Sequence, residues 1–105
     1  MYIVIATDTY NDELEKWPKS DREAAEIIPS KLAVNPYVGD PLGYRFLREK
    51  KVRERRLYFL VYEDLRLVLM VATSGKKNQE STIHHIKNSL DEFRIEAERI
   101  SKQVA

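Results

Sequence analysis

The first part of the chain reads as one strand followed by a helix. Residues 2–7 are mostly β-branched or aromatic, so they predict a first strand. The next ten residues are polar except for Tyr10, Leu14 and Trp17, and this spacing of three to four residues predicts a helix. Pro18 ends that helix, because proline disfavours the helical conformation of the residue before it.

A second helix is predicted directly after the first. Ser20 stands three residues before Glu23, which is the spacing of a capping box at a helix start. The apolar side of this helix consists of Ala24, Ile27, Ile28 and Leu32. Pro29 falls inside the pattern and removes one backbone hydrogen bond, so we expect a kink or break near Ile28. The helix ends before the Asn-Pro pair at positions 35–36.

The middle of the chain predicts a loop and then three strands. Residues 35–44 are rich in proline and glycine, which is typical of a loop. Residues 45–52 form a second strand, and residues 53–62 and 66–73 give the clearest strand patterns. The last two are apolar on both faces, so we expect them at the centre of a sheet that is covered on two sides. The acidic residues 63–64, extended by one residue at most, make the turn between them.

A long amphipathic helix closes the chain, from about Ser81 to Lys102. Its apolar side recurs at steps of three and four residues: Ile83, Ile86, Leu90, Phe93, Ala97 and Ile100. The order β-α-α-β-β-β-α predicts one α+β domain over residues 1–105. It has a small twisted sheet, rich in antiparallel pairs, whose two faces are covered by the N-terminal helical pair and the C-terminal helix. The apolar stripe of this last helix packs on the sheet, and a homodimer through its seam is left open.

Composition narrows the class of protein. The chain has no cysteine, which excludes a disulfide framework, a cysteine-ligated metal site and a cysteine nucleophile. The longest apolar run, Leu67–Ala72, is far shorter than the roughly 20 residues of a membrane helix. The N-terminus lacks the basic region of a signal peptide. We therefore expect a cytoplasmic protein that does not bind membranes.

The net charge of +1 hides a strong segregation of charge. Residues 44–79 hold ten basic and four acidic side chains, whereas residues 1–43 hold four basic and eight acidic ones. The basic cluster consists of Arg45, Arg48, Lys50, Lys51, Arg53, Arg55, Arg56, Lys76 and Lys77. Concentrated guanidinium and ammonium groups bind phosphate backbones and stabilise developing negative charge. A solvated strand pair or an acidic protein partner would explain the same cluster.

Two other sets of side chains are candidates for chemistry. His84 and His85 lie at the start of the last predicted helix, where one of them can face a site and move protons near neutral pH. No spacing typical of metal ligands surrounds them. Aromatic rings that could stack on bases are Tyr37, Tyr44, Tyr58 and Tyr62. For Tyr58 and Tyr62 we favour packing within the sheet.

Taken in order, several segments resemble the RelE/ParE superfamily of toxins from type II toxin–antitoxin pairs. The segments are Asn35-Pro36, Pro41-Leu42-Gly43, the basic strands, the apolar strands at 57–62 and 67–72, and Gly75-Lys76-Lys77. The resemblance spans about residues 2–90 and implies the compact fold of that family. RelE-like members are ribosome-dependent endoribonucleases that cut messenger RNA without a metal and are blocked by a cognate antitoxin. ParE-like members keep the fold but poison DNA gyrase.

The resemblance also implies roles for individual residues. Arg45, with Arg48 as a second candidate, matches the basic residues of the family's second strand. Lys77 matches an arginine that follows the glycine after the last strand, and Lys76 matches the lysine beside it. These positions would bind RNA phosphates and stabilise charge during cleavage.

Two positions depart from the family pattern. The strand that typically contains Tyr-Arg-Leu-Val-Tyr has Phe59 in place of the arginine, and Ile83 replaces a tyrosine near the C-terminus. Arg55 lies on the same strand face as Phe59 and is an imperfect substitute, since it is roughly 13 Å away. His84 follows Ile83 and would supply the missing proton-transfer group.

The resemblance thus implies a metal-independent messenger RNA endoribonuclease that needs no cofactor. Its predicted catalytic residues are Arg45, Arg55, Lys77 and His84, and its predicted RNA-binding residues are Arg48, Lys50, Lys51, Arg53, Arg56 and Lys76. The expected partners are a cognate antitoxin and ribosome-bound messenger RNA. The alternatives are a ParE-like gyrase poison and an inactive protein of the toxin fold that only binds its partner.

Overall fold

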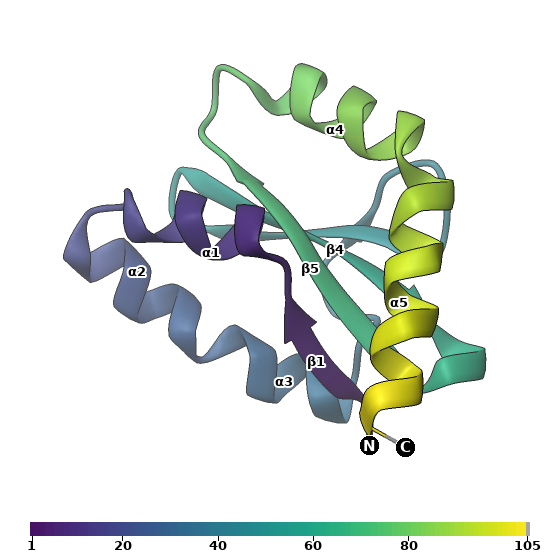
Figure 1. Ribbon diagram of the computed structural model, residues 1–105. Helices are drawn as coiled ribbons and strands as arrows, with labels where there is room; N and C mark the ends of the chain where they lie inside the picture. Colours follow the sequence, from purple (N-terminus) through teal and green to yellow (C-terminus); the bar gives the residue numbers. More distant parts are fainter. Residues whose placement is uncertain (105) are drawn as a thin grey trace.

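The computed structural model describes residues 1–104, which form a five-stranded sheet with helices on both faces (Figure 1). The strands are β1 (Ile3–Ala6), β2 (Asp40–Pro41), β3 (Leu47–Val52), β4 (Arg55–Tyr62) and β5 (Leu67–Ser74). The helices are α1 (Asp8–Glu15), α2 (Lys19–Glu26), α3 (Ile28–Val34), α4 (Gln79–Asn88) and α5 (Leu90–Val104), and a 3-10 turn, η1, spans Glu63–Leu65. The order across the sheet is β1-β5-β4-β3-β2, with β1 parallel to β5 and the other pairs antiparallel. The predicted α+β fold is confirmed.

Residues along β4 alternate between two separate hydrophobic cores. Leu57, Phe59 and Val61 face the first core, which the N-terminal helices cover. Tyr58 and Leu60 face the second core, which the C-terminal helices cover. In Figure 1, α2 and α3 accordingly lie to one side of the sheet and α5 lies to the other. Because β4 and β5 are buried on both faces, their side chains are apolar along almost their whole length, as the sequence predicts.

The region around the second predicted helix confirms one expectation and corrects another. Pro29 does break the helix: α2 ends at Glu26, and Pro29 sits in the first turn of α3, where its missing N–H costs nothing. The capping box was wrong. The helix already begins at residue 19, and Pro18 occupies the cap position, so Ser20 makes no capping hydrogen bond to the backbone. The predicted N-terminal helical pair is thus a set of three short helices.

The single C-terminal helix predicted from Ser81 to Lys102 was also wrong. It is divided at Ser89, which is buried and has a non-helical backbone conformation. Figure 1 shows that α4 and α5 run in different directions from this point. Periodicity does not reveal the break, because Ile86 and Leu90 on either side of it both pack against the second core. Consequently His84 and His85 lie in the second turn of α4 rather than at its start.

A two-residue turn joins β3 to β4 and sets their register. The sequence predicts that Arg53 belongs to the strand, but Arg53 has a positive φ of 58° and forms the turn together with Glu54. Val52 pairs with Arg55 across the turn, so Glu49 comes to lie opposite Tyr58.

Within residues 1–104, no helix is long and apolar enough to cross a membrane.

Gly39 allows the loop before β2 to approach β3 closely. Its φ is +89°, a conformation that favours glycine, and a Cβ atom at this position would collide with the backbone carbonyl of Glu49. Arg48 reinforces the same approach, because its Nη2 donates a hydrogen bond of 3.0 Å to the Gly39 carbonyl. The loop is therefore fastened to β3 beside Glu49.

We predict that Gly39→Ala destabilises the fold by more than about 2 kcal/mol, since it adds backbone strain and a backbone clash. Urea unfolding followed by circular dichroism measures this loss. Gly75→Ala is the matched control, because its Cβ would meet only an Asn78 side-chain oxygen at 3.8 Å. Equal unfolding midpoints for the two variants would contradict the prediction.

Candidate functional site

Most of the predicted basic cluster gathers at one end of the sheet, which we call the hairpin end. It is the end where the Arg53–Glu54 turn meets the last residues of β5. The register pairs Arg56 with Ser74, so the loop that carries Lys76 and Lys77 starts beside the hairpin. The expected approach of this loop to the cluster is confirmed for Lys76, which lines a cavity of about 350 Å³ together with Arg53 and Arg55.

On the first face of the hairpin end, Asp21 of α2 holds two of these arginines. Its carboxylate accepts a hydrogen bond of 2.8 Å from Arg53 Nη1 and one of 3.2 Å from Arg55 Nε. The Arg53 hydrogen bond, assisted by Arg55, lowers the pKa of Asp21 below its ordinary value. The Arg55 guanidinium also lies over the Trp17 ring, 5.5 Å from its centroid. Both arginines are thus fixed by the N-terminal helices and partly neutralised.

On the second face, four polar side chains form a buried cluster: Glu49, Arg56, Tyr58 and Ser74. Arg56 Nε lies 3.4 Å from Glu49 Oε2, with only 16% and 11% of the two side chains exposed. The Tyr58 hydroxyl and the Ser74 hydroxyl share a hydrogen bond of 2.7 Å. Burial raises the pKa of Tyr58. The cluster places a carboxylate, a guanidinium and two hydroxyl groups within the span of three strands.

The Glu49–Arg56 pair is incompletely bonded. Within the described residues, Arg56 Nε has no hydrogen-bond partner, because the contact with Glu49 is too poorly placed to count as one. A buried ion pair costs several kcal/mol of desolvation and is weak evidence for stability. An unused buried N–H donor beside a carboxylate is instead a candidate site for an anion and for proton transfer.

Sequence reasoning missed Glu49 and Ser74 as site residues and assigned Tyr58 to packing. The packing is confirmed, since Tyr58 is fully buried. Alternation along the strand places Glu49 on the same face as Lys51. The side chains that Glu49 contacts on β4 depend on the register that the turn sets, which the sequence pattern does not give. Phe59 is fully buried on the first face, and alternation along β4 places Arg55 on that same face. The β4 guanidinium on the second face is therefore that of Arg56.

Arg45 and Arg48 lie away from the hairpin end. Arg45 lies in a turn before β3, and the six residues of this strand, roughly 20 Å, separate it from the Arg53–Glu54 turn, so the structure does not bring Arg45 and Arg55 together. Arg48 is 8% exposed, and its guanidinium donates hydrogen bonds to the backbone carbonyls of Tyr37, Gly39 and Arg45. Arg48 therefore holds the loop before β2 against β3.

His84 and the lysines remain accessible. The His84 side chain is exposed on α4, with Nε2 lying 3.0 Å from the Asn88 side-chain nitrogen. Among residues 1–104, none of the cluster lysines forms an ion pair: Lys50, Lys51, Lys76 and Lys77. The same residues contain no group of three histidine or acidic side chains placed to hold a metal ion. The free cations of the hairpin end are therefore lysines.

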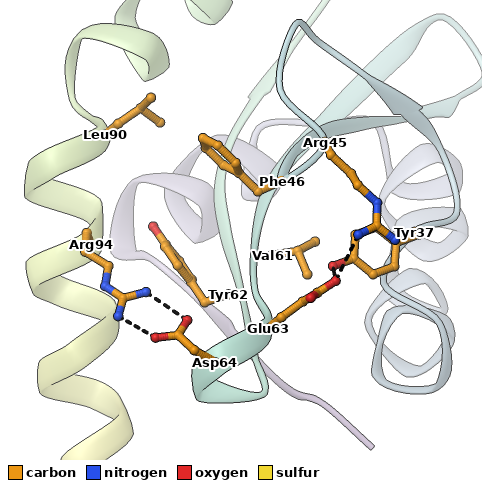
Figure 2. Close-up of a pocket in the computed structure, with 9 residues that line it drawn as sticks. All are labelled: Tyr37, Arg45, Phe46, Val61, Tyr62, Glu63, Asp64, Leu90 and Arg94. Carbon is orange, nitrogen blue, oxygen red and sulfur yellow. Dashed lines mark hydrogen bonds and ion pairs between the residues drawn. The ribbon is translucent and has the colours of Figure 1, made fainter.

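A larger cavity of about 830 Å³ lies at the other end of the sheet, and Figure 2 shows the side chains around it. Its walls are mainly apolar and aromatic: Tyr37, Phe46, Val61, Tyr62 and Leu90. Two ion pairs border it, Arg45 with Glu63 and Arg94 with Asp64. Burial raises the pKa of Tyr62 to about 12, so its hydroxyl stays protonated at neutral pH. We call this space the aromatic cavity.

Comparison with solved structures relates this architecture to toxins. A variant of the E. coli RelE toxin in the free state matches with a TM-score of 0.69 and 16% identity, over 83% of this chain and 96% of that one. The intact E. coli RelBE toxin–antitoxin complex matches with a TM-score of 0.63 and 16% identity, over 71% and 96% of the two chains. The RelBE2 complex of Mycobacterium tuberculosis matches with 0.62 and 22%, over 70% and 96%. The chain has a RelE-like fold. No protein-family model and no curated protein matches its sequence.

The charge pairing at Asp21 predicts a pH-dependent effect on stability. Because the pKa of folded Asp21 lies below its ordinary value of 3.8, its contribution is present above that pH and is lost as the pH falls further. We expect Asp21→Asn to lower the urea midpoint at pH 7 and to approach the wild type as the pH drops below about 3.8. Glu54→Gln, at an exposed position in the same cavity, is the control. A gap that stays constant with pH would refute the assignment.

Proposed function

We propose that this protein is the toxin of a toxin–antitoxin pair and that it cleaves ribosome-bound messenger RNA without a metal ion. The proposal rests on the RelE-like fold together with the buried cluster at the hairpin end. The observation that carries it is the Glu49–Arg56 pair, in which a carboxylate lies beside a guanidinium with an unused N–H donor. RNA cleavage by its own 2′-hydroxyl requires these two functions, a proton acceptor and a stabiliser of phosphate charge.

The chemistry divides between the members of the cluster. The 2′-oxygen attacks the adjacent phosphorus atom while Glu49 accepts its proton. Arg56 donates hydrogen bonds to the phosphate oxygens as their negative charge increases, and Tyr58 and Ser74 keep the neighbouring strand positions in place through their own bond. The bond to the 5′-oxygen then breaks, leaving a 2′,3′-cyclic phosphate and a 5′-hydroxyl. His84, exposed on α4, remains the proposed proton donor to that 5′-oxygen.

The lysines and the first-face arginines supply binding rather than chemistry. The cluster lysines without ion pairs attract the RNA backbone through long-range charge, which falls off with salt. Lys77 is exposed in the loop between β5 and α4, beside the Ser74 end of β5, and we propose that it stabilises the scissile phosphate from outside. Arg55 is held by Asp21, so we assign it to phosphate binding together with Arg53.

We also propose a cognate antitoxin as the protein partner, acting in the cytoplasm where translating ribosomes are found. The support is that RelE chains have been solved in complexes with antitoxin. The basic surface at the hairpin end offers such a partner both a charge to neutralise and a site to block. A homodimer through α5 stays a prediction, with Ile95, 66% exposed, as the residue whose substitution would test it.

We predict that Glu49→Gln and Arg56→Ala each reduce cleavage by about 10²- to 10⁴-fold, which is the usual loss on removing a general base or a charge stabiliser. The measurement is cell-free translation, followed by mapping of new 5′ ends within translated messages. Arg99→Ala is the control, because this arginine pairs with Glu96 one turn earlier on α5, away from the buried cluster. Circular dichroism verifies that each variant folds.

Unimpaired cell-free translation with folded wild-type protein would exclude the ribonuclease. Relaxed or broken plasmid DNA in cells that express the protein would indicate the gyrase alternative. Full cleavage by a folded Arg56→Ala variant would leave the ribonuclease in place but remove Arg56 from its mechanism.

A further inference from the structure

The aromatic cavity continues into an exposed pair of stacked rings. Tyr44 and Phe46 have ring centroids 4.8 Å apart and planes inclined by 27°. They are 44% and 37% exposed, although large aromatic side chains are usually covered. Phe46 is also a wall of the cavity, as Figure 2 shows, so the aromatic surface runs from the inside of the cavity to the outside of the protein. Rings displayed in this way are available to stack on a flat ligand.

Cations accompany these rings. Lys87 Nζ of α4 lies 5.9 Å from the centroid of the Tyr44 ring, and the Arg45 guanidinium lies 4.1 Å from that of Tyr37. Each of the two arginines that line the cavity pairs with an acidic residue, Arg45 with Glu63 and Arg94 with Asp64. The charges of these lining side chains therefore cancel. A neutral planar ring therefore suits the interior, while Lys87 on the outer side suits an anionic group attached to that ring.

The cavity and the proposed cleavage site are connected by β3, which is six residues or roughly 20 Å long. Phe46 immediately precedes β3 and lies three residues before Glu49, a distance of roughly 10 Å along an extended strand. The cavity volume of about 830 Å³ falls within the range typical of ligand sites. RNA reaching Glu49 would thus have its neighbouring nucleotides within reach of the aromatic rings.

We propose that the aromatic cavity binds a nucleobase of single-stranded RNA, stacked on Phe46, at a nucleotide of the same strand as the one that is cleaved. This inference rests on the proposed function for the source of the RNA. It assigns the bound chemical class, a purine or pyrimidine ring with a phosphate near Lys87. Stacking, rather than hydrogen bonding to base edges, would make the site tolerant of sequence.

The test compares two ligands that differ only in the base: adenosine 5′-monophosphate and ribose 5-phosphate. Each is titrated into the folded wild-type protein, and the methyl resonances of Val61 and Leu90, which line the cavity, are followed by NMR. We expect ring-current shifts of both residues with the nucleotide and none with the sugar phosphate. Equal responses to the two ligands, or none to either at millimolar concentration, would overturn the proposal.

Variants of Phe46 separate stacking from simple apolar contact. We expect Phe46→Leu to weaken nucleotide binding by about tenfold or more and Phe46→Tyr to preserve it, because only the latter keeps a flat ring. Ile27→Ala, at an exposed position between α2 and α3 that does not line the cavity, is the control. If Phe46→Leu left nucleotide binding unchanged and instead impaired antitoxin binding, the cavity would be a protein-docking site and the proposal would fail.

The experiment also distinguishes the cavity from the cleavage site. Glu49→Gln should reduce cleavage strongly and retain nucleotide binding, whereas Phe46→Leu should weaken binding in an assay that requires no cleavage. If the wild type cleaves RNA but shows no base-dependent shifts, only the proposed nucleobase site is refuted. If the shifts depend on the base but the protein never cleaves RNA, only the proposed ribonuclease activity is refuted.

Discussion

Burial of β4 and β5 on both faces is the constraint on which the rest of the structure depends. Phe59 and Tyr58 are successive residues that are fully buried in opposite directions, one under the N-terminal helices and one under the C-terminal helices. Each large apolar side chain buried in this way contributes about 1.5–3 kcal/mol. Polar groups are therefore excluded from the middle of the central strands and are confined to their ends. Both the buried polar cluster and the aromatic cavity lie at such ends.

Alternation along the strands was enough to predict the faces of the sheet, because it follows directly from backbone geometry. The sequence alone therefore assigns Phe59 and Arg56 to opposite faces of β4. Features that depend on local breaks were harder to predict. Ser89 interrupts the last helix without disturbing its apolar spacing, and Pro18 takes the cap position that Ser20 was expected to fill.

The polar cluster could not be predicted, because it depends on the register between strands. Arg53 adopts a left-handed conformation that its residue type does not favour, and the resulting two-residue turn sets Glu49 opposite Tyr58. A turn longer by one residue would move every β3 side chain to the opposite face. The carboxylate would then lie on the other side of the sheet from Arg56. Composition and charge revealed the basic cluster but not this pairing.

The structure also divides the basic residues by chemical type. Every arginine of the cluster has an internal partner: Arg45 binds Glu63, Arg53 and Arg55 bind Asp21, Arg56 lies against Glu49, and Arg48 binds backbone carbonyls. The lysines of the cluster, in contrast, have no ion-pair partner within residues 1–104. Planar guanidinium groups hold fixed geometries, whereas flexible ammonium groups act as mobile point charges.

This division reconciles the net charge of +1 with the anionic substrate proposed above. The lysines provide attraction at long range, where only the sum of nearby charges matters. The arginines provide orientation at short range, and their acidic partners reduce the net charge without removing the donors. Arg56 differs from the rest because its partner is a carboxylate that is buried with it. A near-neutral protein can therefore present a locally strong phosphate site, provided that the compensating acids are held beneath the arginines rather than in the path of the substrate.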